Sequence, residues 1–144
     1  MPLLLSLFLA CSGSSPEPEE DELAASIGTG DWEWQDLSDG DGIPVIMGPQ
    51  GGYHLLGSVR VSGIAAGDAK DLSDPGNPTT TFSVWHLGEN LTERAVFVEG
   101  LESVLEDSSP YRHEMLGRFA ILSIGHDSDL DGEEIRFHVR VEDV

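Results

Sequence analysis

Apolar and polar residues alternate in several short runs along the chain, which is the pattern of strands with one buried face. The clearest run is residues 135–141, where Ile135, Phe137, Val139 and Val141 alternate with basic side chains. No stretch of the sequence shows a convincing helical period. The pattern therefore predicts an all-β fold.

Turn-forming Gly, Pro, Asp and Asn residues separate about seven such runs between residues 32 and 144. Two sheets packed face to face are the simplest way to bury one face of every strand, so we expect a β-sandwich. The last two runs are expected to pair as a hairpin across the turn at residues 127–132. The expected strands are residues 32–34, 43–47, 55–64, 79–86, 95–98, 119–124 and 135–141.

The spacing of these strands resembles that of immunoglobulin-like and fibronectin-III-like sandwiches, which implies one such domain at residues 32–144. The chain has 144 residues, a length that suits one domain. Its only cysteine is Cys11, so the paired cysteines of antibody domains are missing and the resemblance is architectural. A small barrel or a jelly roll is the alternative.

The N-terminal residues have the features of a targeting signal. The apolar run at residues 2–10 is too short to cross a bilayer as a helix, but it has the length of a signal-peptide hydrophobic region. The motif at residues 7–11, LFLAC, resembles a bacterial lipobox, with Phe8 where leucine is usual. The resemblance implies a signal peptide at residues 1–10 and a lipid anchor on Cys11. An ordinary cleaved signal peptide or a buried N-terminal strand is the alternative.

Residues 11–31 begin with the cysteine and continue as a small, polar and acidic segment, which is typical of a disordered tether. Ser12 resembles a residue that permits sorting to the outer membrane, so the outer membrane of a bacterial cell envelope is expected rather than the inner one. Three further segments resemble uncharacterised bacterial lipoproteins, a resemblance that implies location and fold and supplies no role. These segments are residues 48–54, 71–79 and 116–118.

The charge of the chain narrows the possible partners. With 27 acidic residues against 7 Lys and Arg, the net charge is −20 and nucleic-acid binding is not expected. The sequence has no nucleophile elbow, phosphate loop or metalloprotease helix motif. We therefore expect a non-catalytic interaction or structural module, attached to the membrane through its lipid, with an envelope protein or a glycan as partner.

One acidic turn has the spacing of a calcium loop. Asp127, Asp129 and Asp131 stand at alternate positions before a glycine, as in the first half of such a loop, and Glu133 would add a further ligand. The glutamate that closes the loop in EF-hands is missing. An acidic turn chosen for its backbone conformation is the alternative. The turn at residues 36–41 offers a weaker site for the same reason, and no other cofactor is expected.

Basic residues predict a second kind of site. In a sandwich of this type the third, sixth and seventh strands share a sheet, and their outward positions would form a basic face. Such a face would recognise an anionic partner, either a carboxylate-bearing glycan or an acidic protein segment. Cross-strand ion pairs with Glu99, Glu133 or Glu142 are the alternative. The residues of the expected face are Arg60, Arg118, Arg136, His138 and Arg140.

Tryptophans offer a third possibility, since Trp32, Trp34 and Trp85 could stack on sugar rings in a carbohydrate-binding module. Core packing is the commoner use of tryptophan. Trp85 has the parity opposite to Phe82 and Val84 and is expected to face outward. The sequence thus leaves three functions open: an envelope interaction module, a calcium-binding β-domain and a carbohydrate-binding module.

Overall fold

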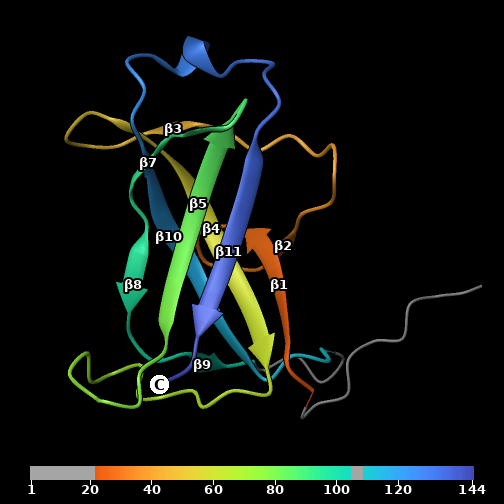
Figure 1. Ribbon diagram of the computed structural model, residues 1–144, viewed down its shortest axis with the longest axis vertical. Coiled ribbons are helices and arrows are strands. Elements are labelled where there is room, and N and C mark those ends of the chain that lie inside the picture. Colours follow the sequence, from red (N-terminus) through yellow and green to blue (C-terminus); the bar gives the residue numbers. More distant parts are fainter. Residues whose placement is uncertain (1–21, 105–108) are drawn as a thin grey trace, which may run out of the picture.

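The computed structural model describes residues 22–104 and 109–144, which form two antiparallel β-sheets packed face to face (Figure 1). The helical content of these ranges is one short 3-10 helix, η1 (Asp127–Asp129). The expected all-β sandwich is therefore confirmed. The expected signal peptide and Cys11 lie outside the described residues.

The larger sheet has the order β2-β1-β4-β10-β7, with β3 beside β4 and β9 beside β10. Its two ten-residue strands, β4 and β10, form the centre of the rear layer in Figure 1. The strands of this sheet are β1 (Ala24–Thr29), β2 (Gln35–Asp36), β3 (Ile46–Met47), β4 (Tyr53–Ser62), β7 (Thr92–Arg94), β9 (Glu102–Ser103) and β10 (His113–Leu122).

The smaller sheet has β5 at its centre, with β11 on one side and the short strands β6 and β8 on the other. It forms the front layer in Figure 1. Its strands are β5 (Thr79–His86), β6 (Glu89–Asn90), β8 (Val96–Val98) and β11 (Arg136–Glu142).

The core lies between the layers and is centred on Phe82, which is fully buried. Its ring lies 5.8 Å from that of Phe137 and 6.2 Å from that of Phe97. Gly57 of the larger sheet faces this ring, and a Cβ there would come within 2.7 Å of it, so the glycine makes room for the phenylalanine. Each large side chain buried here stabilises the fold by about 1.5–3 kcal/mol. The other main core residues are Leu55, Val59, Val61, Val84, Met115, Ala120 and Leu122.

Several strands follow the sequence pattern closely. Strand β5 coincides with the expected run at residues 79–86, and β11 is shifted by one residue from the expected run at 135–141. In contrast, the expected strand at residues 32–34 is a bend without strand structure, and only the end of the expected run at 43–47 forms a strand. These two segments form little or no strand because they share few hydrogen-bonding positions with a neighbouring strand.

The expected tether at residues 11–31 is wrong over its described part, because Ala24–Thr29 form β1. This strand pairs with β4 from Ala24 opposite Ser62 to Gly28 opposite Ser58. Its side chains are mostly small and show no apolar alternation, so its strand conformation comes from hydrogen bonding to a neighbour. The sandwich therefore includes residues ahead of the expected boundary at residue 32.

The expected hairpin between the last two long runs is also wrong. Strand β10 belongs to the larger sheet, whereas β11 pairs with β5 in the smaller sheet along its whole length. The connection between them crosses from one layer to the other at the end of the sandwich that carries η1 (Figure 1). A period of two predicts a strand and its buried face, but it carries no information on which strand will be the partner.

Candidate functional site

The outer face of the smaller sheet is exposed and carries the side chains that alternate with the core positions. On β5 the buried residues are Thr80, Phe82 and Val84, and the residues between them are half-buried or exposed. The register places each outward residue of β5 beside one of β11, as expected for antiparallel pairs. We call this surface the open face. It comprises Thr79, Thr81, Ser83, Trp85, Asn90, Val96, Val98, Arg136, His138, Arg140 and Glu142.

At one end of the open face, Trp85 stands between Arg136 of β11 and Asn90 of β6 in the strand register. The tryptophan is 36% exposed. The side-chain oxygen Oδ1 of Asn90 accepts hydrogen bonds from the backbone N and Oγ1 of Thr92, both at 2.9 Å. These contacts fix the amide and leave its Nδ2 group to donate elsewhere. The row therefore offers an aromatic surface flanked by two groups of hydrogen-bond donors.

The cations of the open face differ in their partners. Arg140 Nη2 donates to Glu142 Oε1 at 2.6 Å, so this residue has an ion-pair partner, but within its own strand and not across strands as the alternative expected. Arg136 has no ion-pair partner among residues 22–104 and 109–144. An exposed guanidinium can bind a carboxylate through two parallel hydrogen bonds. The open face therefore presents an available cation on a strongly acidic protein.

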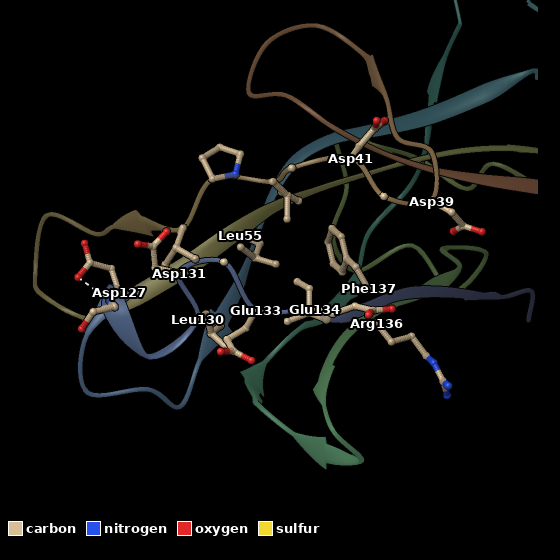
Figure 2. A pocket seen from close by; sticks show the side chains of 18 residues that line it. Asp39, Asp41, Leu55, Asp127, Leu130, Asp131, Glu133, Glu134, Arg136 and Phe137 are labelled. Carbon is tan, nitrogen blue, oxygen red and sulfur yellow. Dashed lines mark hydrogen bonds between the residues drawn. The ribbon is translucent and has the colours of Figure 1, made fainter.

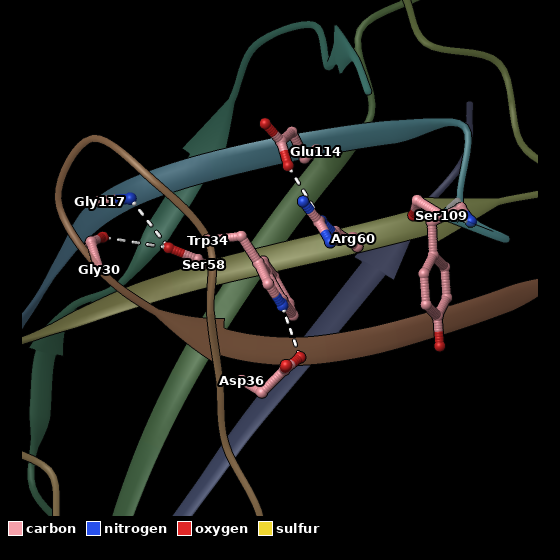
Figure 3. Close-up of polar contacts among 9 residues, drawn as sticks. Gly30, Trp34, Asp36, Ser58, Arg60, Ser109, Glu114 and Gly117 are labelled. Carbon is pink, nitrogen blue, oxygen red and sulfur yellow. Dashed lines mark hydrogen bonds and ion pairs between the residues drawn. The ribbon is translucent and has the colours of Figure 1, made fainter. Parts of the chain in front are cut away.

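Arg60 does not belong to this face, so the expected grouping is wrong for it. It lies on β4 in the larger sheet, where its Nε donates to Glu114 Oε2 at 3.0 Å (Figure 3). Its guanidinium also lies 4.7 Å from the ring centre of Trp34, a cation–π distance. Both side chains of the ion pair are largely buried. Arg60 is thus a structural residue.

Arg118 is also misplaced by the sequence prediction, because it lies on β10 and points toward the other sheet. The register of β10 shifts between Met115 and Arg118, which keeps the arginine on the side of the core residue Ala120. There it forms an ion pair with Glu99 and lies 5.9 Å from the ring centre of Phe97. Burial lowers the pKa of Arg118. Glu99 neutralises the charge of Arg118 at one side of the sandwich, so this charge is not available to a binding partner.

A short segment, residues 30–36, passes over the outer face of the larger sheet and covers the part of it around Ser58 and Arg60 (Figure 3). Ser58 Oγ donates to the backbone oxygen of Gly30 at 3.3 Å and accepts from the backbone N of Gly117 at 3.1 Å. Trp34 Nε1 donates to Asp36 Oδ1 at 2.7 Å. We call this surface the covered face. Its residues are Ser58, Arg60, Ser62 and Glu114, with residues 30–36 above them.

The end of the sandwich near η1 contains an acidic cleft of about 1220 Å³ (Figure 2). Two loops that are far apart in the sequence line it, residues 39–45 and 127–137. Carboxylates dominate its polar lining, which also includes Arg136, so the net charge of the cleft is negative and Arg136 lies where the cleft meets the open face. The acidic residues that line it are Asp39, Asp41, Asp127, Asp131, Glu133 and Glu134.

The four residues expected to bind calcium lie at this end, but they do not converge. Asp129 Oδ2 accepts from the backbone N of His126 at 3.0 Å, and Asp127 Oδ1 accepts from Ser128. Glu133 Oε2 lies 3.3 Å from His86 Nε2, and Asp131 lines the cleft. In the part of the chain that the structure describes, no three acidic, His or Cys side chains are grouped to hold a metal ion. The calcium interpretation stays a prediction from the sequence.

The three tryptophans occupy different environments. Trp34 is engaged by Arg60 and Asp36 on the covered face, so its ring is not free to stack on a ligand. Trp32 is 89% exposed at the bend before it. Trp85 lies on the open face, as its parity predicts. It is therefore the tryptophan that shares a flat surface with an available arginine.

Two histidines have shifted titration, and both belong to the larger sheet. Burial lowers the pKa of His54, whose ring stacks on Phe119 with centres 4.2 Å apart. Burial, and secondarily the charge of Arg112, lowers the pKa of His113. Both residues are therefore held in the neutral form near pH 7 and belong to the packing of the sheet.

The sequence prediction missed four polar residues of the open face: Thr79, Thr81, Ser83 and Asn90. The alternation of β5 contains the signal for the first three, since all share the parity of Trp85. Asn90 could not be placed from the sequence, because its position depends on the pairing of β6 with β5.

Comparison with protein-family models, with curated proteins and with solved structures finds no match to the chain. Among the described residues, no helix has the length and apolar character needed to cross a membrane. The site must therefore be interpreted from its own chemistry.

Proposed function

We propose that this protein is a lipid-anchored lipoprotein of the bacterial cell envelope and a non-catalytic interaction module. Its partner, an envelope component, binds the open face of the smaller sheet. The observation that carries this proposal is the position of Trp85 beside Arg136, which has no ion-pair partner among the described residues, on an exposed sheet surface. Trp and Arg are the residue types most enriched at the energetic centres of interfaces.

The contrast between the two outer faces supports this choice of surface. On the covered face, Arg60 and Trp34 have partners within the chain. On the open face, the corresponding combination of an arginine and a tryptophan is exposed to solvent. A protein that needed these residues only for stability would gain little from them there, since exposed charges contribute about 0–1 kcal/mol.

The anchor is supported by the sequence at residues 7–11, where the lipobox-like motif ends in Cys11. This cysteine is the only one in the chain and stands where lipidation would use it. The mass of the mature protein tests this part of the proposal. We expect an acylated N-terminal cysteine and its loss, with release from the membrane, in Cys11→Ala. An unmodified Cys11 in the membrane fraction would contradict the anchor.

Photo-crosslinking in intact cells tests the surface. A photoreactive amino acid placed at Ser83, in the middle of the open face, is expected to give a discrete adduct with an envelope component. The same amino acid at Trp32, which is 89% exposed but lies off the open face, is the matched control and should give none. Equal adducts at both positions, or none at Ser83, would overturn the assignment of the surface.

A further inference from the structure

We propose that the ligand of the open face is an acidic polysaccharide whose sugar rings carry carboxylates. This inference rests on the proposed function, because it names the ligand class of the same surface. Trp85 stacks against one ring and Arg136 binds the carboxylate of that ring. Arg140, which is paired with Glu142 in the free protein, exchanges this partner for the carboxylate of a second acidic sugar along the chain.

The first contact set lies at the end of the open face. Trp85 presents an aromatic surface between Arg136 and Asn90 in the strand register. A pyranose ring has an apolar face that suits an aromatic platform, and its substituents project around the ring. Arg136 can bind a carboxylate there in a bidentate manner, while the Nδ2 group of Asn90 can donate to a hydroxyl on the other side.

The second contact set extends along β11. Arg140 follows Arg136 by four residues on the same face, a separation of about 13 Å along a strand. Between them lie Ser83 and His138, and Thr81 stands beside Arg140. These groups offer hydrogen bonds to a chain that runs along the strands. A single sugar cannot reach both arginines, so an oligomer is required for full affinity.

The third strand of the face adds an apolar margin. Val96 of β8 lies beside Thr81 and is 59% exposed, and Val98 beside Thr79 is 54% exposed. Apolar faces of sugar rings can cover such side chains without a loss of hydrogen bonding. The face thus combines a basic edge, a row of hydroxyl groups and an apolar edge.

Charge complementarity favours an anionic ligand where exposed guanidinium groups lie close together, and the open face carries two of them, Arg136 and Arg140. The chain carries a net charge of −20, and the cleft at the end of the sandwich is lined by six carboxylates. A polyanion is therefore repelled from most of the protein and is attracted only where guanidinium groups are exposed. At physiological salt the repulsion is screened beyond about 8 Å, so contacts on the open face decide the binding.

The position of the site on the central strand favours a polysaccharide over an acidic peptide. A peptide recognised by a sheet commonly adds to it as a strand, through main-chain hydrogen bonds at an edge. Here the tryptophan and the hydroxyl groups belong to β5, which is the central strand of the smaller sheet. A ligand that reaches them must lie across the sheet, as a sugar chain does when it stacks on an aromatic side chain.

Binding of polygalacturonate and alginate to the full-length chain tests the proposal, measured by calorimetry and tryptophan fluorescence at 0.15 M NaCl with a chelator present. We expect saturable binding of both polymers. Methyl-esterified polygalacturonate, which keeps the rings but lacks the charges, should bind at least tenfold more weakly. The galacturonic acid monomer should also bind at least tenfold more weakly than the polymer, because it reaches one arginine.

Two pairs of variants distinguish a loss of binding caused by changes on the open face from a loss caused by removing any exposed tryptophan or arginine. Trp85→Thr and Arg136→Gln should each weaken binding at least tenfold, whereas Trp32→Thr and Arg94→Gln should leave it unchanged. Trp32 and Arg94 are exposed residues of the same types outside the open face. Unfolding curves of all four variants verify the fold, and Arg136→Lys should restore only part of the affinity because lysine lacks the bidentate geometry.

The outcomes distinguish this inference from the proposed function. If neither polymer binds, or if the control variants lose as much affinity as the open-face variants, the polysaccharide ligand is overturned. If Ser83 still gives a specific photo-crosslinked adduct in that case, the open face remains the proposed binding surface and its ligand belongs to another class. If the adduct is a protein, the acidic-peptide alternative replaces the polysaccharide.

Discussion

The two outer faces of the sandwich use the same residue types in opposite ways. On the covered face, Arg60 and Trp34 contact each other, and each has a further acidic partner, Glu114 or Asp36. On the open face, Arg136 and Trp85 stand side by side in the register with their polar groups exposed. The difference teaches that residue type alone does not mark a binding surface. The useful criterion is whether other residues of the fold already occupy the polar groups of the arginine and the tryptophan.

The physical reason for the difference is the segment at residues 30–36. It crosses the larger sheet, removes water from Ser58 and Arg60, and supplies backbone acceptors and an aromatic ring in return. The smaller sheet has no such cover among the described residues. Its outward side chains stay hydrated. Three substitutions sharpen this comparison.

The largest effect is expected at the cover. Gly117 has φ of 63° and faces the cover, where a Cβ would lie 2.5 Å from the backbone oxygen of Asp31. Gly117→Ala should reduce the free energy of unfolding by about 2–4 kcal/mol, through backbone strain and the clash. Chemical denaturation measures this loss. Gly132→Ala is the control, with φ of 75° but open space around it, and should cost only about 1–2 kcal/mol. Equal losses would mean that the cover is not packed against the sheet.

An effect of comparable size is expected when the buried ion pair is broken. Arg60→Met leaves Glu114 buried without its cation and should cost about 2–4 kcal/mol. Arg140→Met breaks the pair with Glu142 on the open face, where solvent compensates, and should cost about 0–1 kcal/mol. Thermal and denaturant unfolding compare the two. A similar loss for both variants would contradict the distinction between the faces.

The smallest effect concerns pH. Because burial lowers the pKa of His54 in the folded state, protonation favours the unfolded chain. Its contribution to stability is present above the unfolded pKa of about 6.5 and is lost as the pH falls through the lower, folded pKa. His54→Phe removes this contribution, so wild type should lose stability relative to the variant as the pH falls below the unfolded pKa of His54. Parallel pH curves for the two proteins would show that burial does not disfavour the charged ring.

Much of the fold can be predicted from the sequence because the long strands have clear alternation. Phe82 and Val84 identify the buried side of β5, and Phe137 and Val139 identify that of β11. Strand β1 could not be predicted, since its small side chains carry no pattern and its conformation depends on pairing with β4. The sequence pattern also could not predict which strand pairs with which, and this is why the predicted hairpin between β10 and β11 was wrong.

The candidate site likewise has a part that alternation predicts and a part that depends on strand pairing. Alternation alone predicts that Arg136, His138 and Arg140 face outward and that Trp85 does so on its own strand. Their meeting on one surface follows from the pairing of β5 with β11, which the sequence does not reveal. The predicted grouping of these residues with Arg60 was wrong because Arg60 lies in the larger sheet.

The pairing of β5 with β11 has a consequence for the order of folding. It joins residues 79–86 to residues 136–142, so the intervening chain must close a long loop before the two strands can meet. Non-local pairings of this kind form slowly. The open face therefore forms only when β5 and β11 have paired, so a partly folded chain that lacks this pairing also lacks the row of side chains that the two strands share.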